Sequence, residues 1–161
     1  MAGPFHDFLL LSRIDYDYTD YMKLINNRHA LRIHDNLIHY IADTLRWITC
    51  YNPAKKGLPK HKGLNLYGPT IIKSDGAEAA WKVFRAWADL FSIGPKEIEL
   101  KGYYILDEGE GGLEVVEERG GQYEKLSFKR DEIMRQFKKV ASYCREVSEG
   151  GEEVFLLHLG V

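Results

Sequence analysis

Hydrophobic residues recur every three or four positions in three stretches of the chain, and this period predicts three helices. The first covers about residues 18–50, where the repeat consists of Ile33, Leu37, Ile41, Leu45 and Ile48. The second begins near Asp75, which has Glu78 three residues later as in a capping box, and ends at Gly94-Pro95. The third covers about residues 131–148 and ends at Gly150-Gly151.

Shorter apolar runs between these stretches predict strands. They cover residues 8–14, 67–73, 97–106, 113–118, 123–128 and 153–161. The strands within 97–128 follow one another through glycine-rich turns, which is typical of a β-meander. The last run lacks alternation, as expected of a strand that is covered on both faces. We therefore expect an α+β fold, with a single mixed, mostly antiparallel sheet of five or six strands packed with three main helices.

Length and composition indicate one globular domain over residues 1–161. The chain is 45% hydrophobic and 29% charged, and a domain of this size buries enough surface to fold without disulfides or metals. No apolar run approaches a membrane span or a secretory signal, so we expect a cytoplasmic protein. Cys50 and Cys144 lie among apolar neighbours, which favours reduced, buried thiols.

Charge is distributed unevenly along the chain. Residues 44–74 contain six cationic and no acidic residues, whereas residues 97–118 contain eight acidic residues and only one cation, Lys101. These could be two solvated surfaces that attract each other, or one of them could face a partner. The acidic stretch is the better candidate for a partner-binding surface, because a row of carboxylates suits a basic cleft. Its candidate residues are Asp107, Glu108, Glu110, Glu114, Glu117 and Glu118.

Few residues suggest catalysis. The sequence lacks a Gly-x-Ser-x-Gly elbow, a His-Glu-x-x-His pair, a phosphate-binding loop and a dinucleotide fingerprint. His29, His34 and His39 recur every five residues, and on a helix they would diverge too far to share a metal. We therefore predict no catalytic residue, no metal and no cofactor.

Two alternatives remain open. Asp35, His39 and Asp43 would form one row on a helix, which could orient a base or hold a cation in a small-ligand enzyme, or could simply solvate the helix. A basic loop with Lys55, Lys56, Lys60 and Lys62 could contact nucleic acid, although the pI of about 6.3 disfavours this reading.

Three segments of residues 67–161 carry a resemblance to a protein class. They are Tyr-Gly-Pro-Thr-Ile at 67–71, Trp-Ala-Asp-Leu-Phe-Ser at 87–92 followed by Gly94-Pro95, and Phe-Leu-Leu-His-Leu-Gly at 155–160. With its size and acidic stretch, the chain resembles the immunity proteins of bacterial polymorphic-toxin and contact-dependent inhibition systems. That resemblance implies a non-catalytic inhibitor, which neutralises a cognate toxin, foremost a nuclease, by binding it.

Overall fold

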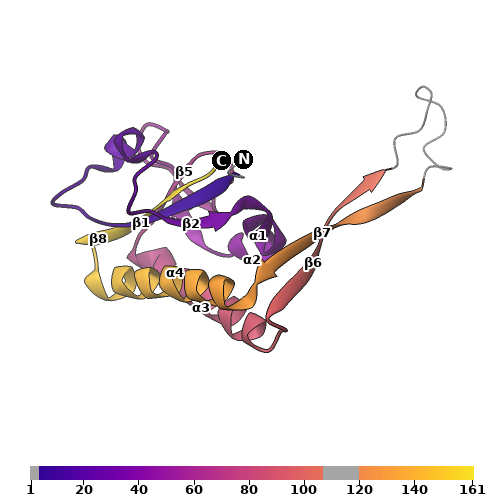
Figure 1. Cartoon of the computed structure of the whole chain (residues 1–161). Helices are drawn as coiled ribbons and strands as arrows, with labels where there is room; N and C mark the ends of the chain where they lie inside the picture. Colours follow the sequence, from indigo (N-terminus) through magenta and orange to yellow (C-terminus); the bar gives the residue numbers. More distant parts are fainter. Residues whose placement is uncertain (1–3, 107–119) are drawn as a thin grey trace, which may run out of the picture.

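A six-stranded antiparallel sheet forms the body of the protein (Figure 1). The computed structural model describes residues 4–106 and 120–161. From one edge to the other, the strands are β2 (Leu31–His34), β1 (Phe5–Ser12), β8 (Val154–Leu159), β5 (Pro69–Ile72), β3 (Thr49–Tyr51) and β4 (Lys60–Lys62). The expected α+β class with a mostly antiparallel sheet is confirmed.

The C-terminal strand β8 lies inside this sheet, between β1 and β5. Phe155, Leu156 and Leu157 are successive residues that point to opposite faces, yet each is at most 1% exposed. The uninterrupted apolar run therefore reflects a strand covered on both faces, as the sequence predicts.

Helices α3 (Ser74–Ser92) and α4 (Arg130–Gly150) pack side by side against one face of the sheet (Figure 1). Phe84 of α3 and Phe137 of α4 are fully buried, with ring centroids 5.7 Å apart. Charged residues occupy their outer faces, as an amphipathic helix requires. Among the described residues, no helix has both the length and the apolar character needed to cross a bilayer.

The opposite face of the sheet is covered by residues 13–30, which include the 3-10 helix η1 (Tyr18–Leu24). Leu24 packs there with Leu9, Phe155 and Leu157. The sheet therefore separates two apolar clusters, the larger under α3 and α4 and the smaller under η1.

The predicted helix over 18–50 is wrong in extent. The chain instead forms η1, strand β2, two short helices, α1 (Asp35–Tyr40) and α2 (Ala42–Leu45), and strand β3. Asn26 has a φ of 63°, and Leu31–His34 pairs with β1, so the backbone cannot stay helical. The five periodic apolar residues are nevertheless all buried, because both the strand and the short helices turn them into the core.

Strands β6 (Glu97–Leu106) and β7 (Gly121–Lys129) form a separate two-stranded sheet, which we call the arm. The arm starts beside α4 and projects away from the body (Figure 1). β6 pairs directly with β7, up to Leu106 opposite Gly121. The middle strand predicted at 113–118 lies outside the described residues.

The two cysteines are free and buried, as predicted. Burial raises the pKa of Cys50 to about 12 and also raises that of Cys144, since a thiolate is costly to form in an apolar environment. Neither thiol is suited to nucleophilic chemistry.

Candidate functional site

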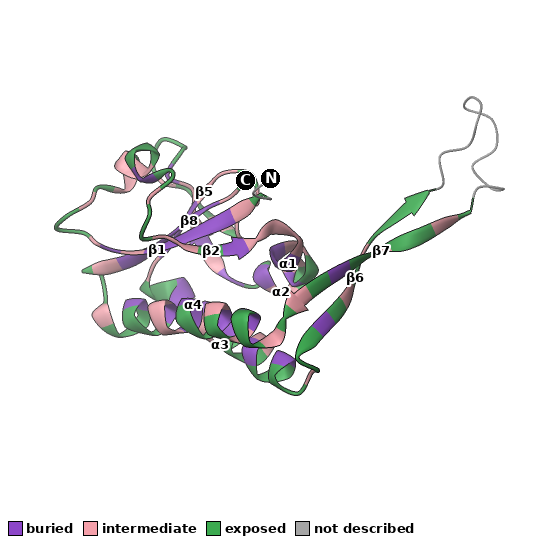
Figure 2. Cartoon of the chain, in the orientation of Figure 1, coloured by how far each residue is buried: buried purple, intermediate pink, exposed green. Residues whose placement is uncertain are grey.

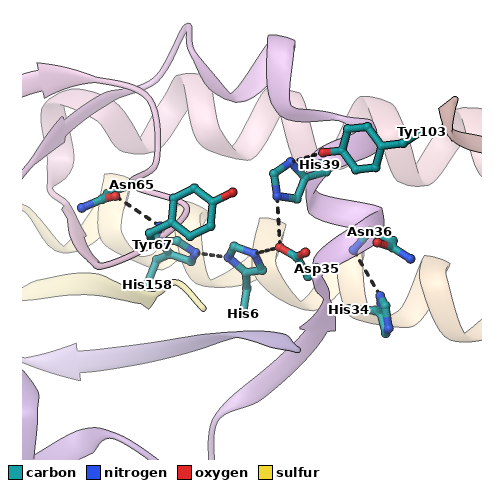
Figure 3. Close-up of polar contacts among 9 residues, drawn as sticks. All are labelled: His6, His34, Asp35, Asn36, His39, Asn65, Tyr67, Tyr103 and His158. Carbon is teal, nitrogen blue, oxygen red and sulfur yellow. Dashed lines mark hydrogen bonds and ion pairs between the residues drawn. The ribbon is translucent and has the colours of Figure 1, made fainter. Parts of the chain in front are cut away.

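Two histidines from distant parts of the sequence meet inside the sheet. His6 of β1 and His158 of β8 are fully buried, and His6 Nδ1 lies 2.8 Å from His158 Nε2 (Figure 3). Strand register brings them together, because Phe8 pairs with His158 and His6 lies two residues away on the same face. Burial is the main cause that lowers the pKa of both imidazoles, so both are neutral near pH 7.

Helix α1 supplies a carboxylate and a third imidazole. Asp35 Oδ1 lies 2.8 Å from His6 Nε2 and 3.3 Å from His39 Nε2. Asp35 and His39 are one helical turn apart, so both reach the same point (Figure 3). The side chains of Asp35 and His39 are each 19% exposed, whereas His6 is sealed. One carboxylate therefore connects the buried histidines to one at the surface.

The arm completes this arrangement through Tyr103. The hydroxyl of Tyr103 lies 2.9 Å from His39 Nδ1 (Figure 3). The pairing register shifts between Lys101 and Tyr104, so β6 carries a bulge here. Bulges re-aim side chains, and this one turns Tyr103 towards α1. Gly102 lets the strands approach closely at the bulge, because a Cβ there would lie 3.0 Å from Glu124 Cβ and 2.8 Å from Glu124 Oε2.

The protonation states of this chain of contacts follow from the donors and acceptors. Partial desolvation, reinforced by the Asp35 charge, raises the pKa of Tyr103, so its hydroxyl stays protonated and donates to His39 Nδ1. The neutral His39 then carries its proton on Nε2, facing Asp35. His6 likewise donates from Nε2 to Asp35, and its Nδ1 accepts from His158 Nε2.

The last histidine of this network, His158, agrees with this assignment. His158 Nδ1 is buried and has no hydrogen-bond partner among the residues described. In the assigned tautomer this atom is a bare acceptor, which is less costly to leave unpaired than an N–H group. The Asp35 carboxylate thus accepts from His6 and lies beside His39, and His6 in turn contacts His158.

A small cavity opens beside His39. Its volume is about 150 Å³, and its lining includes His39, Tyr103, Lys101 and Glu124. It lies where the arm meets α1, so it presents an imidazole, a phenol, an ammonium and a carboxylate to a ligand of a few atoms. This combination can bind a small polar molecule and exchange a proton with it.

The structure brings together two of the three residues in the row predicted from sequence. Asp43 does not join Asp35 and His39, because the backbone leaves helical geometry at Ile41, where φ is −99° and ψ is 4°. Its side chain is 95% exposed and lies 4.0 Å from Arg46. The row of three is therefore wrong, and the pair is correct.

Sequence reasoning missed His6, His158 and Tyr103. Their positions result from strand pairing across the chain and from a bulge, which no local period reveals. An imidazole inside two strongly apolar strands was the available signal, because a buried polar group needs a partner. His34 also differs from its expected place on a long helix: its side chain accepts from Asn36 N and caps α1.

Of the two charged stretches predicted from sequence, the structure describes the basic loop but not the candidate residues of the acidic surface. Asp107, Glu108, Glu110, Glu114, Glu117 and Glu118 lie outside the described residues. In the basic loop, Lys60 pairs with Asp75 at 2.9 Å and Lys62 donates to Thr49 Oγ1 at 2.8 Å. Lys55 and Lys56 are exposed. Two of the four lysines are thus already engaged within the fold.

Neither a metal-binding geometry nor a similarity to known proteins identifies the function of this site. Within residues 4–106 and 120–161, no group of three His, Cys, Asp or Glu side chains is placed to hold a metal ion. Comparison of the chain with protein-family models, with curated proteins and with solved structures found no match.

Proposed function

We propose that the protein is an acid–base catalyst for a small ligand, with His39 as the group that exchanges the proton. The observation that carries this proposal is the position of His39, between the Asp35 carboxylate and the Tyr103 hydroxyl at a small cavity. A histidine with a carboxylate beside one nitrogen and a displaceable hydroxyl at the other is the arrangement of a general base.

Each residue has a defined part in this mechanism. Asp35, 3.3 Å from Nε2, favours the tautomer of neutral His39 that carries its proton there, so the lone pair is at Nδ1. A ligand O–H group, or a water beside the ligand, replaces the Tyr103 hydroxyl at Nδ1 and gives up its proton there. The deprotonated oxygen then bonds to an electrophilic carbon of the ligand as the bond from that carbon to the leaving oxygen breaks. The imidazolium, which Asp35 stabilises, returns its proton to that leaving oxygen. Tyr103 remains a donor to the ligand's developing negative charge.

The buried pair gives Asp35 a fixed position. His6 holds Oδ1 at 2.8 Å and is itself held by His158, so Asp35 cannot turn away from His39 without breaking a buried contact. Such a network in a sheet interior is costly unless fully connected, and proteins retain costly polar groups mainly at functional sites. His6 and His158 are therefore positioning residues.

Hydrolysis of p-nitrophenyl acetate tests this proposal, since an activated ester reports a reactive imidazole without knowledge of the natural substrate. We expect His39→Gln to lower the protein-catalysed rate by about 100-fold, the usual lower bound for general-base catalysis. His29→Gln is the matched control, because His29 is exposed and lies outside the site. Equal rates for the unmodified protein and His39→Gln would refute the assignment of His39.

A second candidate function is the inhibitor role, in which the chain binds and neutralises a toxin protein. The distal half of the arm supports it: Tyr104, Ile105, Leu106 and Tyr123 are all 43% exposed or more. Exposed aromatic and aliphatic side chains on a projecting element suit a protein interface. The intervening sequence is acidic, which favours a basic partner such as a nuclease.

Pull-down followed by a nuclease assay tests the inhibitor role. We expect a stoichiometric partner whose activity the protein suppresses, and whose association slows as salt rises. Charge reversal at Glu114 and Glu117 should weaken binding, whereas reversal at Glu146, an exposed residue of α4, should not. Unchanged binding of the 114/117 variant would exclude the acidic stretch as the interface.

A further inference from the structure

A second cavity, on the face of the sheet that η1 covers, contains a charged pair on an apolar floor. Its volume is about 480 Å³, within the range of small-molecule sites. Asp7 of β1 and Arg32 of β2 are register partners, and their row continues into Leu159 and Pro69. All four of these residues line the cavity.

Asp7 is unusual for a strand residue in this position. It is 8% exposed, and its neighbours on the same face, such as Leu9, belong to the apolar cluster under η1. Arg32 Nε lies 3.2 Å from Asp7 Oδ1 but does not point along a hydrogen bond, and Oδ1 has no hydrogen-bond partner within the described ranges. Burial raises the pKa of Asp7, which shows that Arg32 compensates its charge incompletely.

Arg32, by contrast, has hydrogen-bond donors that Asp7 does not use. Its side chain is 48% exposed, and its guanidinium carries five donors, more than one carboxylate can occupy. Asp7 thus lines the cavity with a carboxylate whose buried Oδ1 has no donor among the described residues, next to a guanidinium that has donors to spare. A ligand that bears an ammonium and a carboxylate close together would satisfy both.

Most of the remaining lining is apolar, with Asn26 as a polar exception. Met22, Ile25 and Tyr67 line the cavity and are 62%, 47% and 76% exposed, which is high for large apolar side chains. Phe5 and Tyr21 also contribute to the lining. An apolar group in the cavity would cover this surface, and each buried CH₂ would contribute about 0.8 kcal/mol to binding.

We propose that this cavity binds a free α-amino acid with an apolar side chain. Its ammonium lies against Asp7, its carboxylate lies against Arg32, and its side chain packs between Met22, Ile25 and Tyr67. One carbon separates the two charged groups of an α-amino acid, which matches a floor on which Asp7 and Arg32 are direct neighbours. This proposal is separate from the acid–base function, because neither His39 nor Asp35 lines the cavity.

Isothermal titration calorimetry of the whole protein with three matched probes tests the site. L-Phenylalanine carries both charges, phenethylamine lacks the carboxylate, and 3-phenylpropionate lacks the ammonium. We expect saturable one-to-one binding of L-phenylalanine, with each single-charge probe weaker by about tenfold or more, as loss of one charge-assisted contact implies. If the amine or the acid binds as well as L-phenylalanine, or if no probe gives a saturable signal, the proposal is overturned.

Variants locate the binding. Asp7→Asn and Arg32→Gln should each weaken L-phenylalanine by about tenfold. Arg28→Gln is the control, because Arg28 is exposed and does not line the cavity. Arg32 is half exposed, so its variant is expected to fold even if Asp7→Asn does not, and circular dichroism checks both. Undiminished binding by folded Arg32→Gln contradicts the proposal.

Discussion

The sheet interior and the distal half of the arm, residues 104–106 and 121–123, are both antiparallel β-structure, but they use their side chains in opposite ways (Figure 2). In β8, even a histidine is fully buried. In the distal arm, tyrosine and isoleucine side chains remain exposed. Neighbouring layers cover the sheet on both faces, whereas a two-stranded ribbon has no layer of its own and is marginal in water.

The contrast indicates where stability and function reside. The sheet and the helices α3 and α4 bury the apolar surface that stabilises the fold. Tyr103 of the arm belongs to the site, and the residues next to it in the distal half, Tyr104, Ile105 and Leu106, are exposed. Substitutions should therefore separate the two regions by the size of their effect on unfolding.

The largest expected effect is in the core. Phe137→Ala removes a fully buried ring that packs against Phe84 and Phe91, and should lower the free energy of unfolding by about 3–5 kcal/mol. Tyr104→Ala, in the distal arm, should lower it by about 0.5 kcal/mol or less. Urea unfolding followed by circular dichroism gives both values, and similar losses would contradict the division between body and arm.

Acid should destabilise the sheet interior through its histidines. The pKa values of His6 and His158 are lowered from 6.5 in the fold, so the unfolded chain takes up protons first as pH falls. Their stabilisation is complete above about pH 6.5 and declines below it, by up to about 1.4 kcal/mol per pH unit for each histidine. His158→Leu should reduce the slope of unfolding free energy against pH between about 5.5 and 6.5, and His29→Gln should leave it unchanged.

Replacing Gly102 at the bulge should affect both the stability of the arm and the position of Tyr103. Gly102→Ala places a Cβ 3.0 Å from Glu124 Cβ, so the two strands should move apart by a few tenths of an ångström and the contact of Tyr103 with His39 should loosen. We expect a loss of about 1 kcal/mol in unfolding free energy, together with faster amide exchange around the bulge. Exchange as slow as in the unmodified protein would show that the bulge tolerates a side chain.

The smallest expected effect comes from the Tyr103 hydroxyl. Tyr103→Phe removes one partly exposed hydrogen bond and should lower the unfolding free energy by about 0.5 kcal/mol. Tyr104→Phe, one residue along, is the matched control and should have no effect on either the unfolding free energy or the imidazole signals of His39. Identical spectra of His39 in both variants would argue against the contact with Tyr103.

Patterns of apolar residues predicted those helices and strands whose conformation follows from residues close in sequence. The apolar repeats of α3 and α4 and the continuous run of β8 identify those elements correctly, since each is long and uniform. The repeat through Ile33 and Leu37 misled, because a strand residue and a helix residue can both face one core. Part of the site could be predicted from sequence, because Asp35 and His39 share a helix. The contact between His6 and His158 could not, because these residues are 152 positions apart.

The central claim is that Asp35 fixes the proton of His39 on Nε2 and leaves Nδ1 as the base. Two-bond ¹⁵N–¹H correlation spectra of the imidazoles, recorded at about pH 8, where histidines are mainly neutral, read the tautomers directly. The account predicts the Nε2–H form for His39, and the same form for His6 and His158. A protonated Nδ1 on neutral His39 would contradict it, because the nitrogen that Tyr103 contacts could then accept no proton.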